Sequence, residues 1–320
     1  MRLATIRDGS PDGALVAVND VGDRYARVQG VPNMLALMED WSGHQAALAA
    51  AARRLSSDDS ELIANADLTA PLPRSWQWLD GSAFSTHGNL MQIAFGLDPI
   101  DTDRPLMYQG LSDRFYGPTD DVPLPSTDHG IDFEGEFGVI VDRVPMGTSA
   151  AEASEHIKLV VQINDWSLRA IAPIEMKTGF GWVQAKPACS MAPFAITPDE
   201  LGDAWQDGRV ALDLEIEWNG NRFGRANGGQ MDFGFHELVA HAALTRDLVA
   251  GTIIGSGTVS NKNYAEVGSS CISEVRAIEM IAGGAPKTGF MTFGDTIRMT
   301  GRGQDGGAPF GTIDQRVIQA

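Results

Sequence analysis

Three carboxylates that could hold a divalent cation come from two apolar segments of the sequence. The acidic run Asp132-Phe133-Glu134-Gly135-Glu136 supplies Glu134 and Glu136, and Asp165 follows in Asn164-Asp165-Trp166-Ser167. Acidic side chains rarely lie beside buried apolar segments unless a positive charge compensates them. Because hard divalent cations prefer oxygen ligands, this pattern predicts a cation site.

A similar alternation of acidic and apolar residues occurs in Leu212 to Trp218, where it is typical of a strand with one exposed face. Most such acidic pairs do not bind metal. Three features distinguish the earlier segment. Gly135 removes a side chain where the backbone would approach a neighbour closely, residues 138–141 continue the strand as an apolar run, and the next apolar segment ends at Asp165. We therefore expect Glu134 and Glu136 at the end of a buried strand.

The composition excludes several classes of function. The chain has 320 residues, 43% of them hydrophobic, and a formal net charge of -18, which disfavours nucleic acid and anionic membranes as partners. An anionic substrate would then need a local metal, Lys or Arg. Cys189 and Cys271 lie far apart and predict neither a disulfide framework nor a zinc site. With no signal segment and no long apolar run, the sequence predicts a cytoplasmic protein.

The elements that must position these residues fall into two parts. Residues 1–30 predict short strands and residues 32–55 predict helix, and a proline-bearing connection follows. We place a domain boundary near Leu72, which gives a small N-terminal domain (1–72) and a strand-rich second domain (73–320). The segment from Asp101 to Asp128 predicts a loop, more commonly a plain surface loop and alternatively a mobile loop over a site. Strands are predicted at 138–144, 157–163, 210–218, 251–260 and 292–299, and helices at 149–156 and 235–249.

The acidic run, the segment Ile163 to Arg169, Lys186 and the segment Gly255 to Val259 together resemble the fumarylacetoacetate hydrolase family, and most closely its fumarylacetoacetase-like carbon–carbon hydrolases. The resemblance extends from about Trp76 to the C-terminus and is weaker in the N-terminal part. It implies an α+β, β-rich fold, in which a mixed β-roll or sandwich forms the catalytic domain. It also implies a homodimer.

The resemblance assigns a set of metal ligands. In that family the two glutamates and the aspartate bind Mg²⁺ or Ca²⁺, which here are Glu134, Glu136 and Asp165. An additional aspartate of the fumarylacetoacetases matches Asp80, because its spacing to His87 is the spacing between that aspartate and the catalytic histidine. The sequence does not choose among Mg²⁺, Ca²⁺ and Mn²⁺, since all three accept oxygen ligands.

The resemblance also implies catalytic and substrate-binding residues. His87 would remove a proton from water, and Glu274 would orient it and stabilise its charged form, although the segment leading to Glu274 is two residues longer than the family pattern. Lys186 would stabilise developing negative charge, although its sequence context alone fits an ordinary surface lysine equally well. Thr258 would offer a hydroxyl group to the carboxylate of the substrate.

Several substrate-facing residues depart from fumarylacetoacetase. Gly96, Ala172 and Leu111 stand where that enzyme has an arginine, a glutamine and a tyrosine. A different diketo acid is therefore the expected substrate, and Arg114 and Arg169 are the candidates to replace the lost contacts.

Three functions remain open from the sequence. The first is hydrolysis of a carbon–carbon bond in a β-diketo acid of the fumarylacetoacetate or acylpyruvate type, in which a cation stabilises the enolate and His87 and Glu274 activate water. The second keeps the metal but carries out decarboxylation, hydration or isomerisation of a 2-oxo acid. The third is a non-catalytic ligand-binding protein with a structural cation, although such a site has no need of Lys186 and His87.

Overall fold

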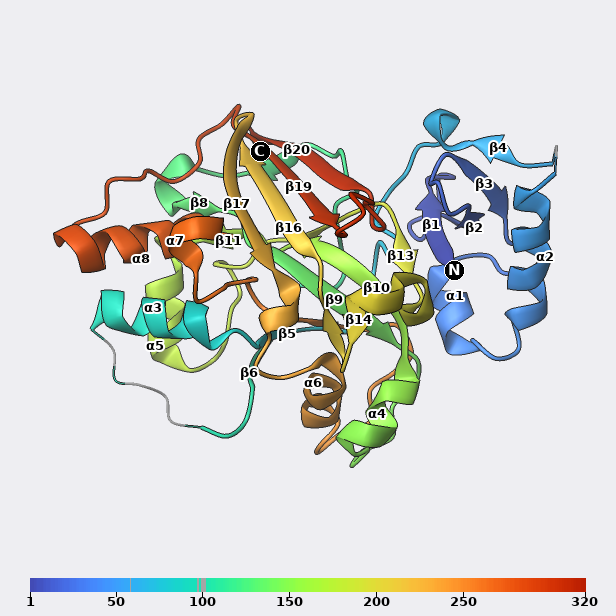
Figure 1. The fold of residues 1–320 in the computed structure, drawn as a ribbon, viewed down its shortest axis with the longest axis horizontal. Helices are drawn as coiled ribbons and strands as arrows, with labels where there is room; N and C mark the ends of the chain where they lie inside the picture. Colours follow the sequence, from blue (N-terminus) through green and yellow to red (C-terminus); the bar gives the residue numbers. More distant parts are fainter. Residues whose placement is uncertain (58, 97, 99–101) are drawn as a thin grey trace.

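Strands from distant parts of the sequence build most of the fold, shown as a computed structural model in Figure 1. The structure describes residues 1–57, 59–96, 98 and 102–320. Two larger sheets and two short strand pairs form within these residues. The strands are β1 (Arg2–Ile6), β2 (Ala14–Val18), β3 (Arg24–Arg27), β4 (Glu61–Leu62), β5 (Trp78–Ser82), β6 (Leu106–Gly110), β7 (Val122–Leu124), β8 (Ile131–Asp132), β9 (Gly135–Val141), β10 (Ile157–Asn164), β11 (Ser167–Leu168), β12 (Ser190–Met191), β13 (Ala195–Ile196), β14 (Trp205–Gln206), β15 (Arg209–Val210), β16 (Asp213–Trp218), β17 (Asn221–Asn227), β18 (Thr252–Gly255), β19 (Thr296–Arg302) and β20 (Thr312–Gln319).

Helices cover the outer faces and ends of these sheets. The α-helices are α1 (Met34–Glu39), α2 (Gln45–Leu55), α3 (Ser85–Phe95), α4 (Ala150–His156), α5 (Ala172–Thr178), α6 (Phe235–Ala242), α7 (Tyr264–Val267) and α8 (Ile272–Gly283), and the 3-10 helices are η1 (Ile63–Asn65), η2 (Thr127–His129), η3 (Pro198–Ala204) and η4 (Gly228–Gln230). No helix of the described residues is long and apolar enough to cross a membrane.

The larger sheet runs in the order β4-β3-β2-β1-β13-β10-β9-β18-β5-β6, and β12 pairs with β10. Its central strands β9 and β18 are buried along their whole length, and β10 is buried at all but one position. Strands buried on both faces need continuous apolar runs, which explains the Val and Ile residues that precede and follow the acidic positions. The fold is therefore strand-rich with both helices and sheets, as the resemblance implied.

The N-terminal strands continue the same sheet. β1 pairs with β2 on one side and with β13 on the other, where Leu3 lies opposite Ala195. Leu3 is fully buried in a core that also contains Leu37 of α1 and Leu159 of β10. The boundary near Leu72 stays a prediction, but hydrogen bonds and a shared core join the two parts.

The second sheet, in the order β17-β16-β19-β20-β7, packs across β9. Its strand β16 carries the second acidic alternation. Glu215 is partly exposed and lies 2.5 Å from Arg302 on the neighbouring strand β19. The segment Leu212 to Trp218 is thus a strand with one wet face, and Asn219 and Gly220 form the turn that follows, both with positive φ.

Some predicted elements end elsewhere than expected. The helix predicted at 235–249 ends at Ala242, and the residues that follow form turns before β18. The loop predicted between Asp101 and Asp128 contains β6 and β7, and Asp101 lies outside the described residues. α3, α5 and α8 are not predicted by the sequence patterns that we used.

Because Leu3 lies in the shared core, we expect Leu3→Ala to destabilise the whole chain by about 2–5 kcal/mol. Urea unfolding followed by far-ultraviolet circular dichroism and by tryptophan fluorescence should show one common, lowered midpoint. The exposed Val21→Ala variant is the control and should shift stability by less than about 0.5 kcal/mol. A lowered midpoint in only one of the two signals would show that the N-terminal part unfolds separately.

Candidate metal and catalytic site

Four carboxylates converge at one end of the central strands. Asp80, Glu134, Glu136 and Asp165 are all buried, and each offers an oxygen that lies within 4.8 Å of the others. They come from β5, from the residue before β9, from β9 and from the residue after β10. The structure thus brings together all four residues that the sequence proposed as metal ligands.

Pairing between β9 and β10 places three of these acids. Glu136 lies opposite Ile163, and the ends of the two strands are tied by hydrogen bonds from Asp165 N to Glu134 O (2.9 Å) and from Glu134 N to Asn164 Oδ1 (3.0 Å). The Asn164 side chain therefore holds the backbone of the acidic run at Glu134. This local pairing explains why the acids of two separate segments meet.

The fourth acid, Asp80, depends on two glycines of β18 and the turn after it. Asp80 lies opposite Gly255 in the parallel pair of β5 and β18. A Cβ at position 255 would lie 2.4 Å from Asp80 Oδ1, too close for any other residue. Gly257 N then donates a hydrogen bond of 3.1 Å to the same oxygen, so the Gly255 to Val259 segment positions a carboxylate.

Gly135 also has a packing role. A Cβ at this position would lie 2.7 Å from Ile216 Cδ1 and 2.8 Å from Leu214 Cδ2, both on β16. The glycine lets the acidic run approach the second sheet, as its position between two glutamates predicted.

Two cationic side chains neutralise part of the cluster. Lys186 is only 9% exposed and donates to Glu134 Oε2 (2.9 Å) and to Asp165 Oδ2. Arg169 pairs with Glu134 and, at 2.8 Å, with Asp132. Lys186 is therefore not an ordinary surface lysine.

The negative charge that Lys186 and Arg169 leave uncompensated suits a divalent cation. Glu136 is fully buried, yet neither of its carboxylate oxygens has a hydrogen-bond partner among the described residues. Two cationic side chains also leave four clustered carboxylates short of positive charge. Buried carboxylates without partners are costly, and a cation with oxygen ligands would satisfy them.

Burial and mutual repulsion raise the pKa of two of the acids, whereas the neighbouring cationic side chains lower the pKa of a third. Burial, followed by the charge of Asp165, raises the pKa of Asp80 to about 8. Burial and the nearby Asp80 raise the pKa of Glu136 well above its ordinary value. Burial also acts on Glu134, but Arg169 and Lys186 outweigh it and lower the pKa of Glu134 below its usual range. Without a cation, protons would offset the repulsion at Asp80 and Glu136.

Two residues that the sequence did not indicate also bind Asp165. Tyr108, which lies opposite Asp80 where β5 pairs with β6, donates its hydroxyl to Asp165 Oδ2 at 2.5 Å. Cys189 Sγ lies 3.0 Å from Asp165 Oδ1. Burial and then the charge of Asp165 raise the pKa of Tyr108 well above its ordinary value, which keeps the phenol protonated as a donor.

His87 and Glu274 face each other from two packed helices. His87 lies on α3 and Glu274 on α8, and Nδ1 of the imidazole is 3.7 Å from Glu274 Oε1. Ser260 donates to that same oxygen at 2.5 Å, whereas Glu274 Oε2 and His87 Nδ1 have no hydrogen-bond partner among the described residues. At 3.7 Å the two side chains are close but do not form a hydrogen bond.

Asp132, the first acid of the run, anchors the helix that carries Glu274. Its carboxylate accepts hydrogen bonds from Ile272 N (2.7 Å) and Ser273 N (2.9 Å) at the start of α8. A negative charge at a helix N-terminus is stabilising. Asp132 therefore links Arg169 to α8 and is not part of the acid cluster.

The two remaining candidates lie differently. Thr258 is buried directly after Gly257, beside the backbone that holds Asp80. Arg114 is exposed and stacks over the ring of Tyr116 at 4.8 Å from its centroid, and the structure shows no contact between Arg114 and the four acids.

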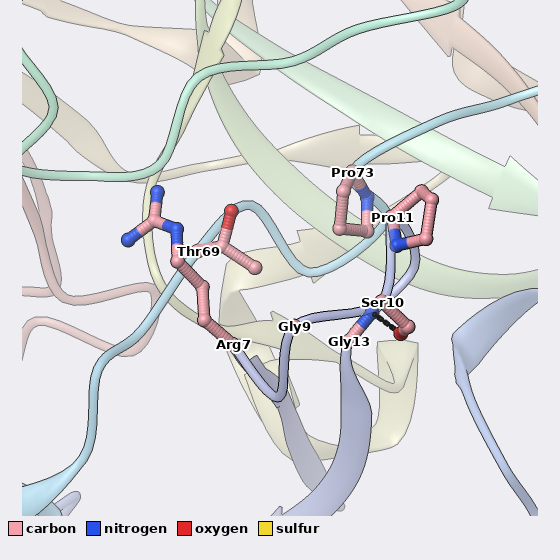
Figure 2. A pocket seen from close by; sticks show the side chains of 7 residues that line it. All are labelled: Arg7, Gly9, Ser10, Pro11, Gly13, Thr69 and Pro73. Carbon is pink, nitrogen blue, oxygen red and sulfur yellow. Dashed lines mark hydrogen bonds between the residues drawn. The ribbon is translucent and has the colours of Figure 1, made fainter.

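A cavity of ≈ 260 Å³ lies away from this site, among the loops that follow β1 and precede β5. Figure 2 shows it lined by Arg7, Ser10, Thr69 and Pro73 together with neighbouring residues. Arg7 is already paired with Asp67 and Asp120. The cavity shares no residue with the acid cluster.

Comparisons with solved structures support the same fold. Maleylpyruvate hydrolase from Sphingobium sp. SYK-6, solved in complex with manganese(II) ion and pyruvate, superposes with a TM-score of 0.68 at 20% identity and full coverage of both chains. The 5-carboxymethyl-2-hydroxymuconate delta-isomerase of Mycobacterium smegmatis gives a TM-score of 0.63 at 20% identity, covering 100% of this chain and 99% of that one. At these identities the likeness concerns the fold.

Sequence comparisons identify the family. The chain is 31% identical over 163 residues to 2,4-didehydro-3-deoxy-L-rhamnonate hydrolase of Sphingomonas sp. (strain SKA58), which covers 50% of this chain and 54% of that relative. The chain thus spans about half the length of the curated relatives it matches first. A family model described as Fumarylacetoacetase N-terminal domain 2 matches residues 1–74, and one described as Fumarylacetoacetate (FAA) hydrolase C-terminal matches residues 77–318. Since these matches cover nearly the whole chain, the protein belongs to the fumarylacetoacetate hydrolase family.

Proposed function

We propose that the protein is a metal-dependent hydrolase that cleaves a carbon–carbon bond of a β-diketo acid, most simply an acylpyruvate. The observation that carries this proposal is the position of the His87–Glu274 pair beside four buried acids, one of which, Glu136, has no hydrogen-bond partner among the described residues. Glu134 forms a β-bridge with Cys271, and Gly135 N donates to Ser270 O at 2.9 Å, so the start of α8, which carries Glu274, lies beside the acidic run.

In this proposal Asp80, Glu134, Glu136 and Asp165 hold a divalent cation, for which Mg²⁺ is our first candidate and Mn²⁺ and Ca²⁺ are alternatives. When bound, such a cation supplies Lewis-acid charge for the two neighbouring oxygens of a diketo acid. Tyr108 and Cys189 fix the rotamer of Asp165 through their hydrogen bonds.

His87 has the properties of a general base. Its neutral imidazole would take a proton from water, and the buried carboxylate of Glu274 would stabilise the imidazolium that forms. The hydroxide adds to the acyl carbonyl carbon, and the bond from that carbon to the adjacent methylene carbon breaks. The electron pair leaves as the enolate of pyruvate, which takes the proton back at carbon, so the products are a carboxylic acid and pyruvate.

The remaining candidates have supporting roles. Lys186, held between Glu134 and Asp165, would stabilise negative charge on the substrate oxygens. Thr258 and Arg169 are our candidates for binding the substrate carboxylate. Arg114 would need to leave its stacked position over Tyr116 to take part.

Named relatives support a substrate of this type. Maleylpyruvate hydrolase was solved with pyruvate, which is a product expected from acylpyruvate cleavage, and with manganese(II). The relative from Sphingomonas is named a hydrolase of a didehydro-deoxy sugar acid. The isomerase among the structural neighbours keeps isomerisation as the alternative reaction on the same cluster. A homodimer and a cytoplasmic location stay predictions.

The purified protein should cleave acylpyruvates in the presence of Mg²⁺ or Mn²⁺. We expect loss of the conjugated enol absorbance and, by chromatography, equal amounts of pyruvate and the carboxylic acid. Excess chelator should abolish turnover. Carbon dioxide or an isomer as the product would instead support the alternative reactions, and full activity in chelator would exclude the proposed role of the cation.

Replacement of either member of the water-activating pair should lower kcat by roughly 10²–10⁴. Because His87 and Glu274 act together, the double variant His87→Ala/Glu274→Gln should be little slower than the slower single variant. Metal binding should be retained in all three variants. Additive losses in the double variant, or an unchanged rate in His87→Ala, would contradict the assignment.

The raised pKa of Asp80 predicts how metal removal affects stability. The unfolded carboxyl has its ordinary pKa near 4 and the folded carboxyl about 8. The stability that Asp80 contributes in the metal-free protein is therefore present at low pH and lost as the pH rises towards 8. Chelation should lower Tm more at pH 8 than at pH 5, as measured by calorimetry. Asp80→Asn should reduce this difference, and an equal effect of chelation at both pH values in the wild type would contradict the prediction.

A further inference from the structure

An aromatic wall extends the acid cluster towards the surface. The rings of Tyr108 and Trp182 meet edge to face, with centroids 6.0 Å apart, and Tyr108 reaches Asp165 through its hydroxyl. Lys186 Nζ lies 5.4 Å from the centroid of the Tyr108 ring. Trp182 is thus separated from the acid cluster by a single aromatic ring, close enough to contact the distal end of a substrate bound at the acids.

Hydrogen bonds to Glu175 and to the backbone hold the segment that carries Trp182 in place. The carboxylate of Glu175 on α5 accepts hydrogen bonds from the backbone N–H groups of Val183 (3.1 Å), Gln184 (2.8 Å) and Ala185 (3.0 Å). Leu168 N donates to Ala185 O at 2.8 Å. The loop between α5 and Lys186 is thus a fixed structure, so the position of Trp182 can contribute to specificity.

The surface of this segment is apolar. Phe180 is 94% exposed and Val183 81%, and Ile174 and Met176 on α5 are exposed as well. Large apolar groups gathered on a surface commonly mark a binding site. Phe180 and Val183 flank Trp182 in the sequence, and Trp182 contacts Tyr108, which binds Asp165 of the acid cluster, so we take the substrate itself as the occupant.

Positive charge that could bind a second carboxylate is scarce here. The sequence contains no lysine or arginine between Arg74 and Arg104, a stretch that includes all of α3, and Lys177 is the one cationic residue from 172 to 185. Lys186 and Arg169 each already pair with two carboxylates. The net charge of -18 further disfavours a doubly anionic substrate.

We infer that the site selects acylpyruvates whose distal acyl group is uncharged and apolar, and that Trp182 is a specificity-determining residue for that group. The inference rests on the proposed hydrolysis of acylpyruvates. It excludes acyl chains that end in a carboxylate as the preferred substrates.

The test compares two acylpyruvates of nearly equal shape. In 4-methylpentanoylpyruvate an isopropyl group stands where succinylpyruvate has its distal carboxylate. We expect kcat/KM to be at least about tenfold higher for the former, since a site short of positive charge disfavours a charged acyl end. An equal or higher value for succinylpyruvate overturns the inference and leaves hydrolysis intact, whereas no cleavage of either compound contradicts the proposed function on which the inference rests.

Variants of Trp182 assign the selectivity to this residue. Trp182→Ala should raise KM for 4-methylpentanoylpyruvate about tenfold with a much smaller change in kcat, and Trp182→Phe should retain most of the affinity. Trp182→Lys should shift the preference towards succinylpyruvate by supplying the missing cation. The exposed Trp76 is the matched control, and Trp76→Ala should leave the ratio of the two kcat/KM values unchanged. An unchanged ratio in Trp182→Lys, with the fold confirmed by circular dichroism, overturns the role of Trp182.

Discussion

Repulsion among four buried carboxylates is the constraint on which the site depends. Asp80, Glu134, Glu136 and Asp165 share one small volume, where unpaired charges are costly. Lys186 and Arg169 compensate part of that charge, and hydrogen bonds from the backbone, Tyr108 and Cys189 hold individual oxygens. Glu136 keeps two oxygens without a partner among the described residues. The arrangement is therefore most stable with a divalent cation in place.

The scaffold meets this constraint by placing the acids where apolar strands end. β9, β10 and β18 supply a buried, hydrogen-bonded framework, and Gly135 and Gly255 allow the close approaches that the acids require. The helices add the second half of the site: α3 and α8 pack together and bring His87 to within 3.7 Å of Glu274. Asp132 couples the two halves, because the same carboxylate binds Arg169 and the start of α8.

The sequence predicted the residues of the cluster better than the elements that support it. Glu134, Glu136 and Asp165 follow apolar runs, and this pattern is local enough to recognise; Asp80 and His87 were found through their spacing and the family resemblance. Tyr108 was missed because β6 is a short edge strand in a segment rich in Asp and Pro. The start of α8 was missed because its capping carboxylate, Asp132, lies 140 residues away from Ile272, and capping signals are recognised only when they are local.

The most direct test of this account is a calorimetric titration of the metal-free protein with Mn²⁺. The account predicts one Mn²⁺ per chain and at least a tenfold loss of affinity in Glu136→Gln, which removes the charge of the carboxylate that has no other partner. Glu215→Gln, on the wet face of β16, is the control and should bind as the wild type does. No binding by the wild-type chain, or equal affinity in Glu136→Gln, would contradict the claim that the buried acids form a cation site.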